Sequence, residues 1–387
     1  YFYLVRTFGD VPFIREAYVN GSQQMSVAKS SEKEILAGLV ADLEMVETGN
    51  YLPGQYSSTD IAQNKGRMTM WAVKALLADI YLWQEEYEKC NRKCDEIIGS
   101  GQLLLVPVES RKIEVENTEE GTTDIYYAPD QSSYYSLFQQ IYYQGNSMES
   151  IFELQFATDN LNPFYSLMSS GRGVIGVKTE RVNSDIFPPL ADEAYSGECF
   201  DIRSVISQSK SCLWKYIGVE PNGSEREQEE YTNNFIIYRL AEIYLMKAEA
   251  LTQMAILDSD NQELLKEAYA AVKVIRDRST AVATTDIGQT EGSYSGKAME
   301  EFVLAERGRE LIFEGKRWFD VLRQAKRNNY DGENLNYLMT LAEYSAPASK
   351  VNSLKAKYRN YHSHYLPIYS EEIDANPLLE QNEFYAN

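Results

Sequence analysis

Histidine is scarce in this sequence, and the motifs that mark common enzyme classes are missing. Only two of the 387 residues are histidines. There is no G-x-S-x-G turn, no Walker loop and no complete dinucleotide-binding glycine set, and we interpret the partial match at 171–176 as a loop. Carboxylates are too abundant to exclude a glycosidase by counting. However, Glu306, Glu310 and Glu314 each have an Arg or Lys within one helical turn, which lowers carboxyl pKa values. We therefore predict a noncatalytic protein without a cofactor.

Metal-binding patterns are equally sparse. If residues 361–365 form a strand, His362 and His364 share one face, but no third ligand is near them in sequence. The cysteines are Cys90, Cys94, Cys199 and Cys212, and they show no C-x-x-C or zinc spacing. Cys90 and Cys94 are four residues apart on an expected helix, where small apolar side chains pack. We predict no metal site.

Positive charge is also in short supply. The chain has 37 Lys and Arg against 58 Asp and Glu, a net charge of −21, which argues against a nucleic-acid partner and favours neutral ligands. No apolar run reaches the 18 or so residues of a membrane span. The chain opens on helix-like residues without Met, a leader or a lipobox cysteine. We therefore interpret it as truncated at its N-terminus, which leaves its location open.

Tyrosine is the compositional outlier, with 29 residues against 14 Phe and 4 Trp. Its ring combines a flat apolar face with a hydroxyl, which suits both sugar binding and wet interfaces, although a core of packed helices accounts for about half of them equally well. We expect the four tryptophans to be packing residues. They are Trp71, Trp83, Trp214 and Trp318.

The segment 298–327 organises the chain. Its apolar residues recur at helical spacing, and oppositely charged residues lie three or four apart, as in Glu306 with Arg309, Glu314 with Arg317, and Lys316 with Asp320. Gly315 marks the point where one helix ends and another begins, so the pattern predicts a helical hairpin. We expect its ion pairs to be partly buried and to fix geometry.

An internal repeat predicts the scaffold. The sequence Leu-Ala-Asp-Ile-Tyr-Leu at 77–82 returns as Leu-Ala-Glu-Ile-Tyr-Leu at 240–245, and faintly as Leu-Ala-Glu at 304–306. Each copy lies in an expected helix pair, at 67–98, 235–278 and 298–327. Small residues facing large aromatics in helix pairs are typical of tetratricopeptide (TPR) repeats. The sequence thus predicts a mostly α protein, with a TPR-like helix-pair scaffold and a loop-rich insertion containing short strands.

The insertion, residues 101–232, is where we expect ligand binding. It is rich in Tyr, Ser, Gly and Pro, with a strand-like run at 150–156, and long irregular connections are usually functional. Sugar rings stack their C–H faces on aromatic planes while amides and charged groups bond the hydroxyls. For any single aromatic here a core position stays the better interpretation, but we expect at least one exposed platform. The candidate carbohydrate-binding residues are Asn160, Asn162, Phe164, Tyr165, Arg172, Tyr134 and Tyr135.

Six motifs in register resemble the SusD/RagB family of surface glycan-binding lipoproteins. The most specific is ERGRELIFEGKRWFD at 306–320. The others are FGDVP at 8–12, the LADIYL helix, ESIFELQF at 149–156, YRLAEIYLMKAEA at 238–250, and a terminal stretch at 366–382 in which Tyr369 replaces the second proline of the family pattern. As the structural signature we take Glu306, Arg309, Glu310, Glu314, Arg317, Trp318 and Asp320.

The resemblance implies a function and a location. It implies one SusD-like unit over 1–387, truncated at its N-terminus, with the scaffold at 1–100 and 233–327, the ligand-binding insertion at 101–232 and a C-terminal extension at 328–387. It further implies capture of an oligosaccharide or polysaccharide for a SusC-like, TonB-dependent transporter. The protein would be a lipoprotein exposed on the outer membrane, held by an N-terminal lipid anchor absent from this chain. The alternative is a TPR-type adaptor that binds a protein or peptide in its helical groove.

Overall fold

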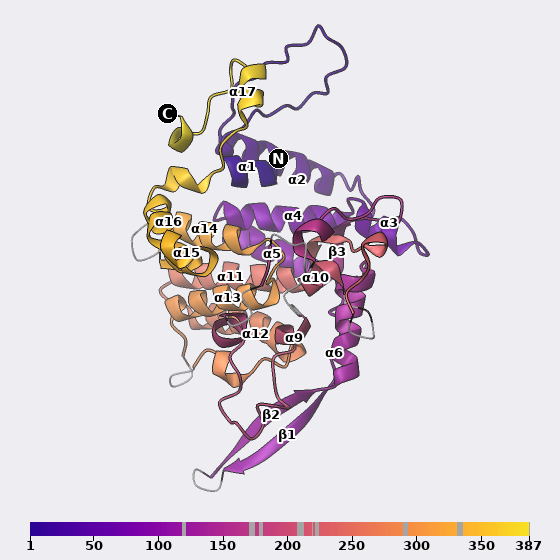
Figure 1. Ribbon diagram of the computed structural model, residues 1–387, viewed down its shortest axis with the longest axis vertical. Helices are drawn as coiled ribbons and strands as arrows, with labels where there is room; N and C mark the ends of the chain where they lie inside the picture. Colours follow the sequence, from indigo (N-terminus) through magenta and orange to yellow (C-terminus); the bar gives the residue numbers. More distant parts are fainter. Residues whose placement is uncertain are drawn as a thin grey trace. The chain divides into compact units, whose positions relative to one another are not determined.

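The structure, a computed structural model, describes residues 1–117, 121–169, 175–177, 181–206, 213–218, 220, 224–288, 293–330 and 336–386 (Figure 1). These residues form two compact units, one of Leu52–Arg317 and one of Tyr1–Tyr51 with Trp318–Asn387. The described residues are mostly helical and include four short strands, which confirms the predicted fold class. Among them, no helix is long and apolar enough to cross a membrane.

The larger unit contains longer helices, shorter helices and two small antiparallel sheets. Its longer helices are α4 (Met70–Trp83), α5 (Tyr87–Ile98), α11 (Leu240–Leu257), α12 (Gln262–Arg278) and α13 (Gly296–Glu310). Its shorter helices are α3 (Ile61–Gly66), α6 (Gln131–Phe138), α7 (Tyr165–Met168), α9 (Arg203–Ile206) and α10 (Trp214–Ile217), with π-helical turns at Gln139–Gln144 and Val182–Ile186. Strand β1 (Ser110–Asn117) pairs with β2 (Thr122–Pro129), and β3 (Ser150–Leu154) pairs with β4 (Phe235–Arg239).

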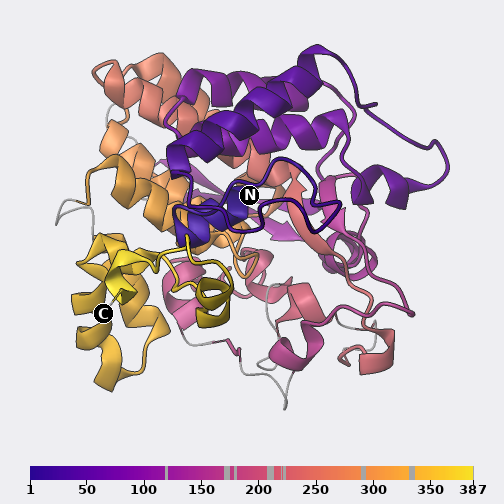
Figure 2. The ribbon, with the colours of Figure 1, turned by 90° about the horizontal axis from the view of Figure 1, so that it is seen from above.

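The two clear copies of the repeat pack side by side, as predicted. Helix α11 packs against α5, α12 and α13, and α4 packs against α5. Figures 1 and 2 show α4 and α5 in purple beside α11 and α12 in salmon. The shared core of α11, α12 and α13 includes Ala241, Leu245, Val272 and Phe302, so the small residue of the repeat does face an aromatic-containing core.

One helix boundary differs from the prediction. The segment 235–239 is strand β4 and not the start of a helix, and α11 begins only at Leu240. Phe235 lies opposite Leu154 and Arg239 opposite Ser150 in the β3–β4 ladder. Aromatic and β-branched residues favour strands, and pairing with β3 decides the outcome here. The strand predicted at 150–156 is confirmed as β3.

Arg239 lies at the centre of a buried network of ion pairs. Its side chain is 1% exposed. The Nη1 atom lies 2.7 Å from Glu149 Oε1 and 2.6 Å from Glu310 Oε1, while Nη2 lies 2.8 Å from Glu314 Oε1. These carboxylates come from the residue before β3, from the end of α13 and from the turn after it. The guanidinium therefore joins three separate segments.

A second guanidinium extends the network into the insertion. Arg203 Nη2 lies 2.6 Å from Asp201 Oδ2, and its Nη1 lies 2.6 Å from Glu306 Oε1 and 3.2 Å from Glu310 Oε2. Arg278, at the end of α12, lies 2.5 Å from Glu310 Oε1. Glu310 is thus shared by cations of the insertion, β4 and α12.

Two helices separated by a turn at Gly315, and the burial of the ion pairs, are confirmed, but one ion pair is different. Helix α13 ends at Glu310, α14 (Arg317–Arg327) begins seven residues later, and Gly315 between them has a φ of 73°. Arg309 lies 2.8 Å from Glu306, as expected. Glu314, in contrast, pairs with Arg239 and Lys215 and not with Arg317, because residues 311–316 form a turn without helical spacing.

The remaining residues of the structural signature contact residues outside the signature. They are Arg317, Trp318 and Asp320. Arg317 Nη1 donates to the Leu304 carbonyl at 2.7 Å, within the larger unit. In the smaller unit, Arg323 donates to Asp320 at 3.0 Å, and the ring of Trp318 lies 5.5 Å from that of Tyr358.

The smaller unit brings two of the family-like motifs together. It contains α1 (Phe2–Phe8), α2 (Glu32–Thr48), α14, α15 (Asn336–Ser345), α16 (Val351–Tyr358) and α17 (Ser370–Ala375). Gly9 ends α1 with a φ of 71°, and a capping box formed by Ser31 and Glu34 begins α2. Asn382 donates to the carbonyls of Phe8 at 3.0 Å and Leu366 at 2.6 Å, so the terminal motif bonds directly to the FGDVP turn.

The two histidines lie in a 3-10 helix, Tyr361–His364, and not in a strand. His362 Nδ1 is 3.2 Å from Glu383, and His364 Nε2 is 2.8 Å from the Tyr358 carbonyl. They make separate local contacts.

The buried network predicts a large stability effect at Glu314. Replacing it by Ala leaves Arg239 and Lys215 buried with too few anions, so we expect unfolding to become easier by roughly 3–5 kcal/mol. Glu301→Ala, at an exposed position on α13, should change the free energy of unfolding by less than about 0.5 kcal/mol. Urea denaturation of both variants provides the comparison. Equal, small effects would show that the network does not stabilise the fold.

The same network predicts a loss of stability in acid. Burial opposes ionisation of Glu306, but Arg203, Arg309 and Arg276 outweigh it and lower its pKa to about 2. Likewise, Arg239 and Lys215 lower the pKa of Glu314 to about 2 despite burial. A carboxyl whose pKa is lower in the folded state stabilises it above the unfolded-state value of about 4.3, and this contribution fades as the pH falls toward 2.

We therefore expect the free energy of unfolding to fall steadily between about pH 4.5 and pH 2. Urea titrations at several pH values measure it. The Glu314→Gln variant should show a shallower fall than the parent protein, since one of the titrating groups is gone. If the free energy of unfolding falls with the same slope in both proteins, Glu314 is not one of the groups that cause the loss of stability in acid.

Candidate functional site

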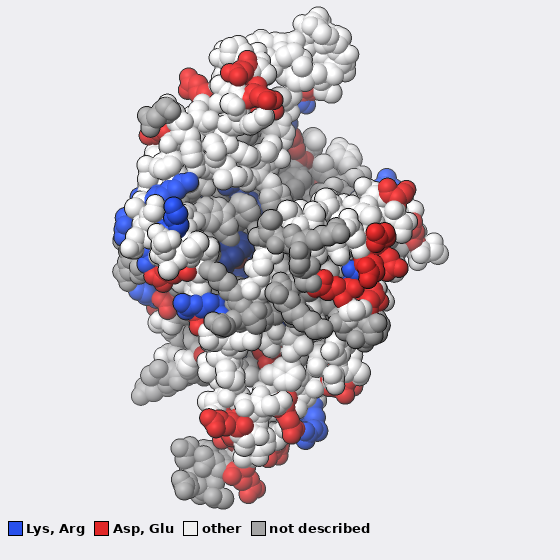
Figure 3. Space-filling model, viewed as in Figure 1, with Lys and Arg blue, Asp and Glu red and all other residues white. Residues whose placement is uncertain are grey.

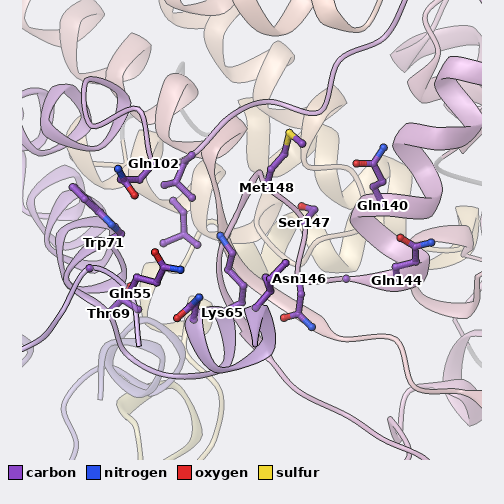
Figure 4. A pocket seen from close by; sticks show the side chains of 16 residues that line it. Gln55, Lys65, Thr69, Trp71, Gln102, Gln140, Gln144, Asn146, Ser147 and Met148 are labelled. Atoms are coloured by element: carbon purple, nitrogen blue, oxygen red, sulfur yellow. The ribbon is translucent and has the colours of Figure 1, made fainter. Parts of the chain in front are cut away.

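A cavity of about 510 Å³ opens in the larger unit, and we call it the amide-lined cavity. Its volume lies within the range of about 300–1,000 Å³ that is usual for small-molecule sites. Three stretches build it: 54–71, with the loop before α3 and the start of α4; 102–103, after α5; and 140–151, from the π-helical turn to β3. Figure 4 shows Trp71, Gln55 and Gln102 on one side, and Gln140 and Gln144 on the other.

Trp71 provides the aromatic surface of this cavity. It lies in the first turn of α4, where the Thr69 hydroxyl caps the helix by accepting from the Ala72 N–H at 3.3 Å. Gly54 lies so close that a Cβ there would be 3.1 Å from the indole Nε1. The capped helix and the adjacent glycine therefore fix a half-buried indole at the cavity wall. We had expected Trp71 to be a packing residue only.

Carboxamides supply the polar groups. Those of Gln102 and Gln144 are exposed and make no hydrogen bond with the described part of the chain. Gln55 Nε2 donates to the Ser57 carbonyl, and Gln140 Nε2 donates to Ser136 Oγ at 2.9 Å. Each of these two retains its amide oxygen as an acceptor.

Two further amides serve the walls of the cavity. Asn64 bonds the loop before α3, accepting from the Tyr56 N–H at 2.7 Å. Asn146 exchanges two hydrogen bonds with Gln155, at 3.0 and 2.9 Å. These bonds hold the backbone that presents the free amides.

One cation, Lys65, lies among the described lining residues. Its ammonium donates to the Ser150 carbonyl. Burial lowers the pKa of Lys65, and the nearby Glu153 carboxylate opposes that shift. Glu153 is itself buried and accepts from the Asn146 N–H at 2.9 Å and from Asn234 Nδ2 at 2.8 Å. The two charges are therefore neighbours within the wall.

The candidate loop aromatics lie in a separate aromatic cluster. Phe164 and Tyr165 are both half-buried, so neither is a fully exposed platform. The Phe164 ring centroid is 5.4 Å from that of Phe235, and the Tyr165 centroid is 5.3 Å from that of Tyr231. The loop folds back because Asn162 is buried and donates to a backbone carbonyl at 2.7 Å.

The other candidates differ in exposure. Asn160 is exposed and forms an isolated bridge with Ala157. Tyr134 is buried, while Tyr135 is 40% exposed and stacks on it at a centroid distance of 5.1 Å. Tyr135 thus presents an aromatic ring to solvent. Arg172 lies outside the described residues.

Sequence reasoning missed the amide-lined cavity because its three stretches are far apart in the chain. Two signals were nonetheless present. Trp71 follows a loop rich in Gly, Pro and Ser, and glutamines recur at 140 and 144, four residues apart. Neither signal identifies a cavity until the helices bring the stretches together.

Comparisons with known proteins agree with the motifs. Residues 207–385 match the model of the SusD family. A SusD-like protein, P2, from Formosa agariphila is 25% identical over 350 residues, 86% of this chain and 64% of the relative. SusD-like protein P25 from the same organism is 24% identical, over 99% of this chain and 70% of that protein. The chain thus spans about two thirds of the length of these relatives.

Solved structures share the fold. A SusD-like protein from Bacteroides fragilis matches with a TM-score of 0.63 and 18% identity, over 99% of this chain and 77% of that one. Surface glycan-binding protein A from Bacteroides uniformis has a TM-score of 0.60 and 22% identity over 98% and 74%. A laminarin-binding SusD-like protein has a TM-score of 0.58 and 20% identity over 99% and 76%. The sequence motifs, the match of residues 207–385 to the family model and the relatives that extend along the chain together show that this chain is similar to proteins of the SusD family.

Proposed function

We propose that the protein binds a glycan in the amide-lined cavity without altering it. The observation that carries the proposal is the placement of the Trp71 ring in one cavity with the free carboxamides of Gln102 and Gln144. An aromatic face suits the C–H surface of a sugar ring, and an amide can both donate to and accept from hydroxyls. The same combination would serve a peptide less well, because a peptide groove needs a row of pockets for alternate side chains.

The similarity to glycan-binding proteins supports this proposal. Two of the structures with this fold carry glycan or laminarin binding in their names. Their identity to this chain is low, so they support the class of ligand and leave its identity to experiment. Laminarin is a reasonable first ligand to test.

The placement of carboxylates supports binding over hydrolysis. A glycosidase needs two carboxyl groups on either side of the scissile bond. Among the described residues that line the cavity there is no Asp or Glu. Glu306, Glu310 and Glu314 are committed to buried cations, which lower their pKa values. Such groups are poorly suited to donate a proton.

We further propose that the bound glycan is passed to a SusC-like, TonB-dependent transporter. Similarity to proteins of the SusD family supports this step. The same similarity supports an outer-membrane lipoprotein location with an N-terminal lipid anchor. Weak, reversible stacking would let the glycan leave for the transporter. Co-purification of the full-length protein with a membrane β-barrel from its native cells tests the partnership, and consistent isolation without any such partner would argue against it.

Trp71 should be the largest contributor to binding. By analogy with stacking of nucleic-acid bases on aromatic side chains, Trp71→Ala should cost about 1–3 kcal/mol of binding free energy, or roughly 5- to 150-fold in Kd. A glycan array identifies ligands, and calorimetry on the best of them, beginning with laminarin, measures the loss. Gln102→Ala and Gln144→Ala should have smaller effects in the same direction.

Tyr127→Ala is the matched control for Trp71→Ala. Tyr127 is also aromatic and is 49% exposed, but it lies on β2 and does not line the cavity. Its removal should leave Kd within about twofold. If Trp71→Ala binds as tightly as Tyr127→Ala while both remain folded, the cavity is not the glycan site.

The aromatic loop stays a second proposed contact, with Asn160, Phe164, Tyr165 and the exposed Tyr135 as its binding groups. We expect Tyr135→Ala to weaken glycan binding with little change in Tm, because Tyr135 is 40% exposed. Tyr165→Ala should weaken binding and also lower Tm by several degrees, since its ring packs on Tyr231. Calorimetry and thermal denaturation of both variants separate the two effects. Unchanged binding in both would remove the loop from the site.

A further inference from the structure

We infer that the amide-lined cavity selects neutral glycans over glycans that carry carboxylate or sulfate groups. This inference rests on the proposed function, since it concerns the ligand of the same cavity. It follows from the contacts that the charged and amide groups of the cavity wall already make.

Lys65 is the one cation among the described residues that line the amide-lined cavity. Lys65 donates to the Ser150 carbonyl and lies in the field of Glu153. Glu153 is 1% exposed and fixed by the Ser150 hydroxyl, the Asn146 N–H and the Asn234 amide. Turning Lys65 toward an anionic ligand would break its bond to the Ser150 carbonyl and move its charge away from the buried Glu153 carboxylate. Lys65 is therefore a poor anchor for a ligand anion.

Hydrogen bonds orient the side-chain amides of Gln55 and Gln140 in the cavity. A backbone carbonyl can only accept, so the group of Gln55 that meets the Ser57 carbonyl is its NH₂, and the Oε1 atom remains. Gln140 is also engaged through its NH₂, on Ser136. Lone pairs on these oxygens attract hydroxyl hydrogens and repel carboxylate or sulfate oxygens. Two of the four glutamines in the cavity thus favour a ligand that donates.

The side-chain amides of Gln102 and Gln144 make no hydrogen bond within the described part of the chain. Each offers donors and an acceptor, and so does a hydroxyl. A sugar hydroxyl can use both ends of such an amide, whereas an anionic oxygen uses only the NH₂.

The electrostatic field of the whole chain also disfavours anionic ligands. The chain carries a net charge of −21, and Figure 3 shows Asp and Glu side chains at many places on the visible face. Screening limits this field to about 8 Å at physiological salt, so it acts mainly on the approach of an anion. The local wall therefore decides selectivity, and the net charge adds to it.

The experiment compares two sets of oligosaccharides on the parent protein. The neutral set consists of laminarin, mannan and xylan fragments. The anionic set consists of alginate, polygalacturonate and carrageenan fragments of similar length. Each is titrated by calorimetry in 50 mM and 500 mM NaCl, with Trp71→Ala measured in parallel to report whether binding uses the cavity.

We expect a neutral fragment to bind with a Kd that changes less than twofold between the two salt concentrations, and the anionic fragments to bind at least tenfold more weakly. Gln55→Lys replaces an exposed acceptor by a cation. It should improve binding of an anionic fragment at least fivefold in 50 mM NaCl and weaken binding of the neutral fragment, which loses the Gln55 acceptor. That gain would show that the wall, and not sugar shape, excludes anions.

Two results would overturn the inference, and they are distinguishable. If an anionic fragment binds as tightly as any neutral one, weakens in 500 mM NaCl and is lost in Trp71→Ala, the selectivity is wrong while the proposed site stands. If no fragment of either set responds to Trp71→Ala, the cavity is not the glycan site, and both the inference and the proposed function fail.

Discussion

The guanidinium of Arg239 is enclosed by the carboxylates of Glu149, Glu310 and Glu314, and the arrangement of the larger unit depends on this set of contacts. Removing a cation from water costs several kcal/mol, which is recovered only if all of its partners are in position. An alternative packing of β4 against the end of α13 would leave at least one buried charge unpaired. The network therefore makes incorrect arrangements costly, and contributes more to a unique fold than to net stability.

The same contacts place one wall of the amide-lined cavity. Glu149 and Ser150 are adjacent, and Ser150 lies opposite Arg239 in the β3–β4 ladder. The Ser150 carbonyl accepts from Lys65 on α3, and its hydroxyl bonds to Glu153. The buried ion pairs and the cavity wall thus share a two-residue segment. Binding residues on irregular segments can hold their geometry here because a rigid charged core supports them.

Much of the scaffold could be predicted from the sequence, because it is encoded locally. Helical periodicity, the Ser31 capping box and Gly315 each depend on neighbours within a few residues. The partners of Glu314 could not be predicted, since Arg239 and Lys215 are 75 and 99 residues away and the turn before Arg317 breaks helical spacing. Trp71 was assigned to packing for the same reason: the cavity beside it exists only once residues 102–103 and 140–151 are in place. Phe235–Arg239 became a strand through pairing with β3, which no local pattern specifies.

The central claim is that glycan occupies the amide-lined cavity, and amide hydrogen exchange with and without ligand tests it directly. The best neutral oligosaccharide from the array is added at saturating concentration, and peptides covering the chain are compared by mass spectrometry. The account predicts slower exchange in peptides that cover 54–71, 102–103 and 140–151, with Trp71→Ala abolishing the difference. Slower exchange confined to other segments, with these three unchanged, would contradict it.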